Sequence, residues 1–290
     1  MFWTYVTNGL AIGMIYALVA VGYSMVFGIL RLINFSHGSL YAFGAQIILV
    51  FIGFRLGVWW SILASIITTG LLSLIINKVA LEPLRAKKSI PIASLIATIG
   101  AFYIIQNLMI AILGSERVAF PNFYSIEMNL GNFPMTSTQL ILFLVSLVLL
   151  LILWLIVNKT KIGLAMRAVK QSADTAVLMG IDVNKIISFT FFLGGASAAI
   201  AGALIGGYYQ LVYPTMGSIM GMKAFSAAVL GGIGMLHGSV VGGLIIGVIE
   251  SLAAGYLGGT YRDAFAFIVL ILILLIRPSG IFGKKVITKV

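Results

Sequence analysis

The sequence predicts an all-α, polytopic membrane protein with about nine transmembrane spans, and counts of eight to ten are compatible with it. Of the 290 residues, 61% are hydrophobic and only 9% are charged, a composition that no soluble domain has. Apolar stretches of about 20 residues recur, the length that crosses the roughly 30 Å hydrocarbon core as a helix. Soluble enzymes are therefore excluded, and residues 1–290 are expected to form a single transmembrane domain.

The expected spans follow from the stretches that contain no charged residue. These stretches are 1–30, 32–54, 56–77, 89–115, 128–158, 186–222, 224–249 and 264–276. The stretch 186–222 is too long for one ordinary helix, and the glycine-rich chain after it can hold two short ones. Five spans are expected before Lys159, and four short ones, some of them broken helices, in the C-terminal third. No basic residue precedes Arg31, so the first span lacks the start of a cleaved signal peptide and should be retained.

Charge distribution predicts the orientation. The chain has 18 Lys and Arg against 7 Asp and Glu, a net charge of +11, and the basic residues lie between the apolar stretches. This is the pattern of positive-inside loops, not of a nucleic-acid-binding surface. Placing Arg31 and segments 78–88, 159–185 and 277–289 in the cytoplasm puts fourteen of the 18 basic residues inside. The N-terminus is then outside, the C-terminus is cytoplasmic, and four basic residues remain outside: Arg55, Arg117, Lys223 and Arg262.

Two segments between spans have distinct compositions. Segment 114–139 is rich in Asn, Gly and Pro, which is turn chemistry, and we expect it to cap the outer side. Segment 159–185 is Ala-rich and charged, favourable for a helix but too polar to insert into a membrane. A short cytoplasmic surface helix is expected there.

Glycine is concentrated in the C-terminal third, where 17 of the 33 glycines lie between Gly194 and Gly259. Many are four residues apart, a spacing that lets helix backbones approach closely. The alternative is that they mark broken half-helices beside a transport pathway. Packing is the preferred reading for any single pair, and breaks are expected at Tyr213-Pro214 and within 231–238.

Several kinds of chemistry have no matching motif. No GxxxxGK[ST] phosphate loop occurs, so this chain is not expected to bind a nucleotide or another cofactor. The chain has no cysteine, and its two histidines have no carboxylates at metal-ligand spacing, which argues against a metal site. Ser197 with His237 lacks the second glycine of a GxSxG serine protease and fits a packing face better. No catalytic residue is therefore assigned.

The polar sequence Asn34-Phe35-Ser36-His37-Gly38-Ser39 separates two apolar stretches. It can be an unwound elbow that faces a translocation pathway, or a helix start capped by Ser36 with His37 among the lipid headgroups. We weigh the two readings equally. A second His-Gly-Ser at His237-Gly238 opens a later apolar stretch and is weak evidence of an internal repeat.

Few polar residues fall inside the expected spans. Gln106 and Asn107 are expected to form interhelical hydrogen bonds, and Gln46 lies on the span after the elbow. Glu250 is costly to bury unpaired, so it either binds a proton or a substrate amino group, or has an interfacial or paired position. The paired or interfacial position is preferred.

A family resemblance extends over nearly the whole chain. It rests on residues 8–18, on Ile33–Gly38 with Gly44-Ala45, on Pro83-Leu84-Arg85, on 95–100, on 163–168, on 178–181, on 231–247 and on 277–283. Together these segments resemble the membrane-spanning permease subunits of branched-chain amino acid ABC importers. Importer permeases dock their ATPase through a loop resembling Glu-Ala-Ala-x-x-x-Gly. Here that loop keeps the acid, alanine and glycine positions, departs from the pattern at Asp174 and Thr175, and lacks the final Leu-Pro.

The resemblance implies that the cytoplasmic loop 159–185 couples the permease to its ATPase. The expected contact residues are Ala168, Asp174, Ala176, Leu178, Met179 and Gly180. A mostly apolar translocation pathway is expected to involve Asn34, Ser36, His37, Gly38, Gln46, Gly234, His237 and Gly238. The implied partners are a second homologous permease, two ATP-binding subunits, an extracytoplasmic binding protein and membrane lipid, with no nucleic acid.

The implied function is that of a non-enzymatic inner-membrane permease subunit, which forms half of the pathway for branched-chain or other hydrophobic amino acids. ATP would be bound by the partner subunits. Related permeases carry urea or short amides, and no residue here separates those substrates from leucine. An ion-coupled secondary transporter is the main alternative, because broken helices serve both mechanisms, but its coupling site would depend on Glu250 alone. A passive channel and an intramembrane enzyme rank below it.

Overall fold

The computed structural model describes residues 1–87, 89–121 and 136–283, and this part of the chain is almost entirely helical. Its elements are α1 (Phe2–Leu30), α2 (His37–Gly53), α3 (Val58–Ile76), η1 (Asn77–Leu81), α4 (Glu82–Ala86), α5 (Pro91–Leu113), β1 (Val118–Ala119), α6 (Ser137–Lys159), α7 (Lys161–Gln171), α8 (Ala173–Leu178), α9 (Val183–Tyr209), β2 (Leu211–Val212), α10 (Met216–Gly231), α11 (Leu236–Tyr256), η2 (Gly259–Tyr261) and α12 (Arg262–Ile276).

The polytopic helical class is confirmed. In the described part of the chain, seven helical segments are long and apolar enough to cross a membrane: Phe2–Leu30, Val58–Ala86, Pro91–Leu113, Ser137–Lys159, Val183–Tyr209, Leu236–Tyr256 and Gly259–Ile276. Two further apolar helices, α2 and α10, are shorter, and the count of nine spans stays a prediction.

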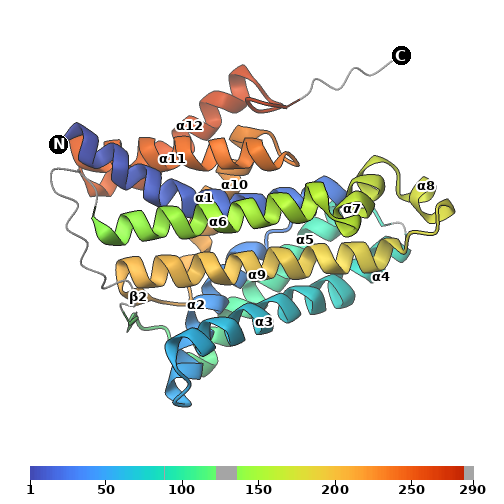
Figure 1. Cartoon of the computed structure of the whole chain (residues 1–290), viewed down its shortest axis with the longest axis horizontal. Coiled ribbons are helices and arrows are strands. Elements are labelled where there is room, and N and C mark those ends of the chain that lie inside the picture. Colours follow the sequence, from blue (N-terminus) through green and yellow to red (C-terminus); the bar gives the residue numbers. More distant parts are fainter. Residues whose placement is uncertain (88, 122–135, 284–290) are drawn as a thin grey trace.

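Helix α1 forms the centre of the bundle. It is buried from Gly9 almost to its end, because its residues are apolar or small on every side. It runs beside α6, α9 and α11 (Figure 1) and packs against all three. The contact with α11 is closest where glycines face it: a Cβ on Gly9 would lie 2.6 Å from the Cα of Val248. Small residues at this contact therefore allow the two backbones to touch.

The peripheral helices carry large apolar side chains on the outside of the molecule. Ile104 on α5, Val148 on α6 and Leu275 on α12 are 69%, 53% and 77% exposed. A water-soluble surface would not expose so many such residues, whereas lipid chains solvate them. These exposed faces are the surface that membrane lipid is expected to contact.

The two helix breaks in the C-terminal third are where the sequence predicts them. α9 ends at Tyr209, the chain passes through β2 and Pro214, and α10 begins at Met216. α10 then ends at Gly231, and α11 begins at Leu236 after a turn in which Gly232 and Gly234 have φ of 102° and 87°. A positive φ favours glycine, so Gly232 and Gly234 are needed for the turn, in addition to the glycines that allow close helix packing.

A small antiparallel ladder is present that the all-α prediction did not include. β1 pairs with β2 through Val118 opposite Val212 and Ala119 opposite Leu211. β1 belongs to the segment expected to cap the outer side, but residues 122–135 of that segment lie outside the described residues. α6 begins just after it with a capping box, in which Thr136 and Gln139 bond to each other's backbone amides.

Basic residues gather at one end of the bundle, which we call the basic end. α4, α7 and α8 lie at this end (Figure 1), and the positive charge of Arg31, just after α1, acts on Lys170 of α7. Arg117 and Arg262 line a cavity beside β2, which lies at the opposite end in the same view. Lys223 does not lie in an outer loop as expected. It is in α10, with only 4% of its side chain exposed.

Candidate functional site

Segment 159–185 forms two short helices rather than one. Thr160 caps α7 by accepting a hydrogen bond from the Gly163 amide at 3.0 Å. Ser172 caps α8 in the same way, accepting from the Thr175 amide at 3.2 Å. α8 lies beyond the ends of the long helices and projects from the body of the molecule (Figure 1). The segment therefore presents a capped helix turn to a partner.

The C-terminal end of α8 exposes large apolar side chains. Leu178 is 86% exposed and Met179 is 78% exposed, and Val177 beside them is 58% exposed. Ala176 is the buried member of the turn, whereas Asp174 is exposed in the first turn. Ala168, on α7, is half-buried. Large apolar side chains concentrated on a small projecting helix are typical of a protein-binding site.

Gly180 ends this helix turn. Its φ is +78°, and the amides of Gly180 and Ile181 donate to Val177 O and Ala176 O at 2.9 and 3.0 Å. Helices often end in this way at a glycine in the left-handed conformation, which costs other residues free energy. A Cβ at Gly180 would meet nothing within 4 Å. Backbone conformation therefore requires the glycine within this chain, and close approach can concern only a partner.

The polar elbow before α2 is buried inside the bundle. Asn34, Ser36 and His37 are 3%, 0% and 1% exposed. Ser36 does not cap α2 with its side chain. Its hydroxyl donates to Asn34 Oδ1 at 2.6 Å, while the Ser39 hydroxyl donates to Ser36 O at 2.8 Å. The expectation of a Ser36 cap with His37 among headgroups is therefore wrong, because side chains within the elbow bond to one another.

His37 stacks edge-on against Tyr23 of α1, with ring centroids 4.7 Å apart. Gly38 packs on α10, where an added Cβ would lie 2.6 Å from Gly217 O. The same glycine borders a cavity of about 270 Å³ that is also lined by Phe35 from the elbow, by Tyr103 from α5 and by Met222 from α10. The elbow thus sits beside an open apolar groove, through Gly38 and Phe35.

The polar side chains inside the expected spans differ in their contacts. Gln46 is buried within α2, and its Oε1 has no partner among the described residues. Gln106 accepts from the Ser218 hydroxyl at 3.3 Å, the interhelical bond that was expected. Asn107 bonds to Tyr103 O of its own helix at 2.8 Å, so the interhelical expectation is wrong for this residue.

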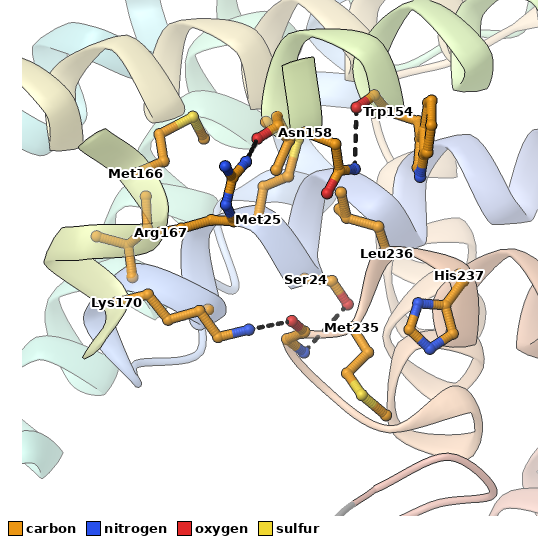
Figure 2. Close-up of a pocket in the computed structure, with 14 residues that line it drawn as sticks. Ser24, Met25, Trp154, Asn158, Met166, Arg167, Lys170, Met235, Leu236 and His237 are labelled. Atoms are coloured by element: carbon orange, nitrogen blue, oxygen red, sulfur yellow. Dashed lines mark hydrogen bonds between the residues drawn. The ribbon is translucent and has the colours of Figure 1, made fainter. Parts of the chain in front are cut away.

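Gly234 and His237 line a second cavity, of about 270 Å³, at the α10–α11 break (Figure 2). Gly238 is buried against Gly231 of α10. The His-Gly-Ser sequences open α2 and α11, but His37 is buried whereas His237 is exposed and stacks on Phe282. The cavity at the elbow and the cavity at the break share no lining residue.

A buried charge cluster at the opposite end contains residues that were not assigned to a site. Glu250 Oε1 accepts from Tyr16 OH and from Lys223 Nζ, both at 3.0 Å, and from Arg262 Nε. Lys223 also lies 2.5 Å from Asp263 Oδ1. The cluster joins α1, α10, α11 and α12, and confirms that Glu250 is a paired carboxylate.

The same cluster borders a cavity of about 330 Å³ lined by tyrosines and by Arg117. The sequence signal was the single lysine that interrupts two apolar stretches, because a lone charge in a span needs a partner. A lysine in an outer loop could not reach a carboxylate inside a span, so the pairing of Lys223 with Glu250 was not predicted.

These features define a class: a polytopic membrane protein with broken helices beside cavities and a projecting apolar helix for a partner. Residues 5–274 match the model of the family "branched-chain amino acid transport system / permease component". The chain belongs to this family. It is therefore a transport permease subunit and not an enzyme.

Several relatives resemble the chain over almost its whole length. It is 37% identical to the high-affinity branched-chain amino acid transport system permease protein LivH of Salmonella typhimurium and to LivH of Escherichia coli K12. It is 38% identical to the high-affinity branched-chain amino acid transport system permease protein BraD of Pseudomonas aeruginosa. Each alignment covers 98% of this chain and 96% of the relative.

Proposed function

We propose that this chain is the permease subunit of an ATP-driven ABC importer in the bacterial cytoplasmic membrane. It forms half of the pathway for branched-chain or other hydrophobic amino acids, which an extracytoplasmic binding protein delivers. The exposed apolar turn of α8 at the basic end carries this proposal, because a subunit without a nucleotide site needs a surface through which an ATPase drives it. The relatives, named as branched-chain amino acid permeases, support the substrate class.

The orientation in this proposal has the N-terminus outside and the C-terminus in the cytoplasm. Fourteen of the 18 basic residues then lie on the cytoplasmic side, as the positive-inside rule requires. Segment 159–185 meets one of two ATPase subunits, and a second homologous permease completes the pathway. The whole of 1–290 acts as one permease domain. ATP is bound by the partners, and this chain holds no cofactor.

The proposed pathway combines the elbow with the α10–α11 break, and Asn34, Ser36, His37, Gly38, Gln46, Gly234, His237 and Gly238 are its candidate residues. Its walls are mostly apolar, so selection of the substrate falls mainly to the binding protein. Urea or a short amide is the alternative substrate. An ion-coupled carrier is less well supported, because Glu250, its candidate coupling group, already accepts three hydrogen bonds.

The test reconstitutes the purified complex in vesicles and follows labelled leucine uptake with the binding protein present. ATP-dependent uptake that survives collapse of ion gradients is expected, together with copurification of an ATPase and a second permease. Labelled urea added in parallel should not enter. Uptake that needs an ion gradient and no ATP would refute the importer proposal, and uptake of urea in place of leucine would refute the substrate.

A further inference from the structure

The cavity at the basic end lies between the ends of three elements (Figure 2). Its walls come from α1, from the last turn of α6 and from α7, and the α10–α11 turn closes it. Met166, Arg167 and Lys170 of α7 line the cavity together with Gly234, and Lys170 bonds to the Gly234 carbonyl. Gly234 and His237 on its wall are also candidate pathway residues, whereas the walls from α6 and α7 are not used by the proposed transport role.

Its polar wall is basic. Lys170 and Arg167 extend from α7 along this wall (Figure 2), and His237 lies at its other side. None of the described residues that line the cavity is acidic. Burial first, and then the charge of Arg31, lower the pKa of Lys170, so an anion beside its ammonium group would be favoured.

The basic groups retain free donors. Lys170 Nζ donates to Gly234 O at 2.8 Å, and one Arg167 nitrogen donates to Val157 O. An ammonium group has three N–H donors and a guanidinium group has five, so each keeps donors for a ligand. Oxygen atoms of a phosphate group match several such donors at once.

Apart from Ser24 and Asn158, the remaining walls are apolar and reach the lipid-facing surface. Met25, Met166 and Met235 line the interior, and Trp154 stands at the α6 side with 43% exposure. Leu151 and Leu155, next to Trp154 on α6, are also exposed. Tryptophan of this kind marks the level of the headgroups, and basic pockets between helices on the cytoplasmic side suit anionic lipid headgroups.

We propose that this cavity binds the phosphate group of an anionic phospholipid from the cytoplasmic leaflet, with the acyl chains lying along α6. Only the assignment of the site to the cytoplasmic leaflet rests on the orientation in the proposed function. α8 projects beyond α7 (Figure 1), and none of its residues is among the described residues that line the cavity, so an ATPase on α8 does not need the cavity. Because Lys170 contacts the α10–α11 turn, the lipid would stabilise the arrangement of α7 against that turn.

The test uses the assembled complex in nanodiscs of phosphatidylcholine with and without phosphatidylglycerol. Native mass spectrometry counts retained lipid, and leucine uptake in matched vesicles is measured separately. The double variant Arg167→Gln/Lys170→Gln should bind phosphatidylglycerol about 30-fold more weakly, since each cation near anionic lipid is worth about 1 kcal/mol. Lys159→Gln/Lys161→Gln, the same charge change on exposed residues outside the cavity, should bind it as the wild type does.

A second variant covers the case in which the double variant does not assemble. Asn158→Asp changes little volume but places a carboxylate on the cavity wall, and it should also displace the lipid. Inorganic phosphate added to the nanodiscs that contain phosphatidylglycerol separates a free anion from a headgroup. It should not compete with the lipid.

Three results would overturn the proposal: equal phosphatidylglycerol retention by the wild type and either cavity variant, displacement of the lipid by millimolar phosphate, or loss of the lipid when the ATPase assembles. The proposed transport function fails separately, through absence of ATP-driven leucine uptake in vesicles of any composition.

Discussion

Replacing Glu250 with glutamine tests whether the buried charge cluster is structural. The substitution keeps the shape of the side chain and removes its charge. Oε1 of the carboxylate accepts from Tyr16, Lys223 and Arg262, whereas Oε2 is buried without a partner among the described residues. The amide oxygen can keep all three bonds, but the amide nitrogen brings two new donors to the unpartnered position.

The cost follows from these contacts. Two of the three bonds come from charged donors, and each weakens by about 0.5–1 kcal/mol when the acceptor becomes neutral. An unsatisfied buried donor adds about 1 kcal/mol, so we expect a total of about 2–3 kcal/mol. This is below the roughly 3–5 kcal/mol for breaking a buried ion pair outright, because Lys223 keeps Asp263 and Arg262 keeps the Tyr209 hydroxyl.

The assay is the temperature at which half of the purified protein loses its monodisperse elution. A destabilisation of this size lowers that temperature by roughly 3–5 °C for a chain of this length. Glu116→Gln, the same change at an exposed position, is the control and should have no effect. ATP-driven uptake at permissive temperature should persist in Glu250→Gln.

Two results would refute this reasoning. An unchanged denaturation temperature would mean that the cluster does not stabilise the protein. Normal stability and assembly with complete loss of uptake would make Glu250 a functional carboxylate and would favour ion coupling. A double variant, Lys223→Met/Glu250→Gln, should lose less than the sum of the single variants, because it removes both charges of one pair.

Three further predictions concern α8, α2 and the start of α9. Leu178→Ser should prevent copurification of the ATPase without changing thermal stability, whereas Leu56→Ser at the opposite end should leave copurification intact. Gly38→Ala should reduce the yield of folded protein, since its Cβ would lie 2.6 Å from a carbonyl of α10, while Gly100→Ala, with nothing within 4 Å, should be neutral. Hydrogen bonds from the backbone and side chain of Lys185 hold the pKa of Asp182 below its ordinary value. The stabilisation is present above the ordinary pKa and is lost as the pH falls through the folded-state value, so hydrogen-exchange protection of the first turn of α9 should fall in acid and become pH-independent in Asp182→Asn.

The sequence was most informative where a local pattern determines the structure. Charge-free stretches located the helices because a bilayer admits no unpaired backbone, and the break after Gly231 was predicted because glycine supplies the positive φ that the turn needs. The exposed turn of α8 was also predictable, since its polar surroundings exclude it from the membrane.

The arrangement of residues from distant parts of the chain could not be predicted in the same way. Lys223 and Glu250 are on different helices, and their pairing depends on how α10 packs against α11. A position for His37 among the headgroups was one of two equally weighted readings, because its neighbours are polar. His37 is instead buried against Tyr23, and its Nε2 has no partner among the described residues. The sequence shows that burying a charged or polar side chain is costly. Only the packing of the helices shows which partner, if any, stabilises it.

The contact between Lys170 and Gly234 connects the two regions that sequence reasoning treated separately. α7 is joined to α8 through Ser172, and its Lys170 holds the carbonyl of Gly234 in the α10–α11 turn. The amide of the same glycine donates to the Ser24 hydroxyl of α1 at 3.4 Å, so the turn is held from both sides. A displacement of α7 must therefore either break the Lys170 bond or move the turn against α1. In an importer driven from α8, this turn is the first part of the proposed pathway that such a displacement would reach.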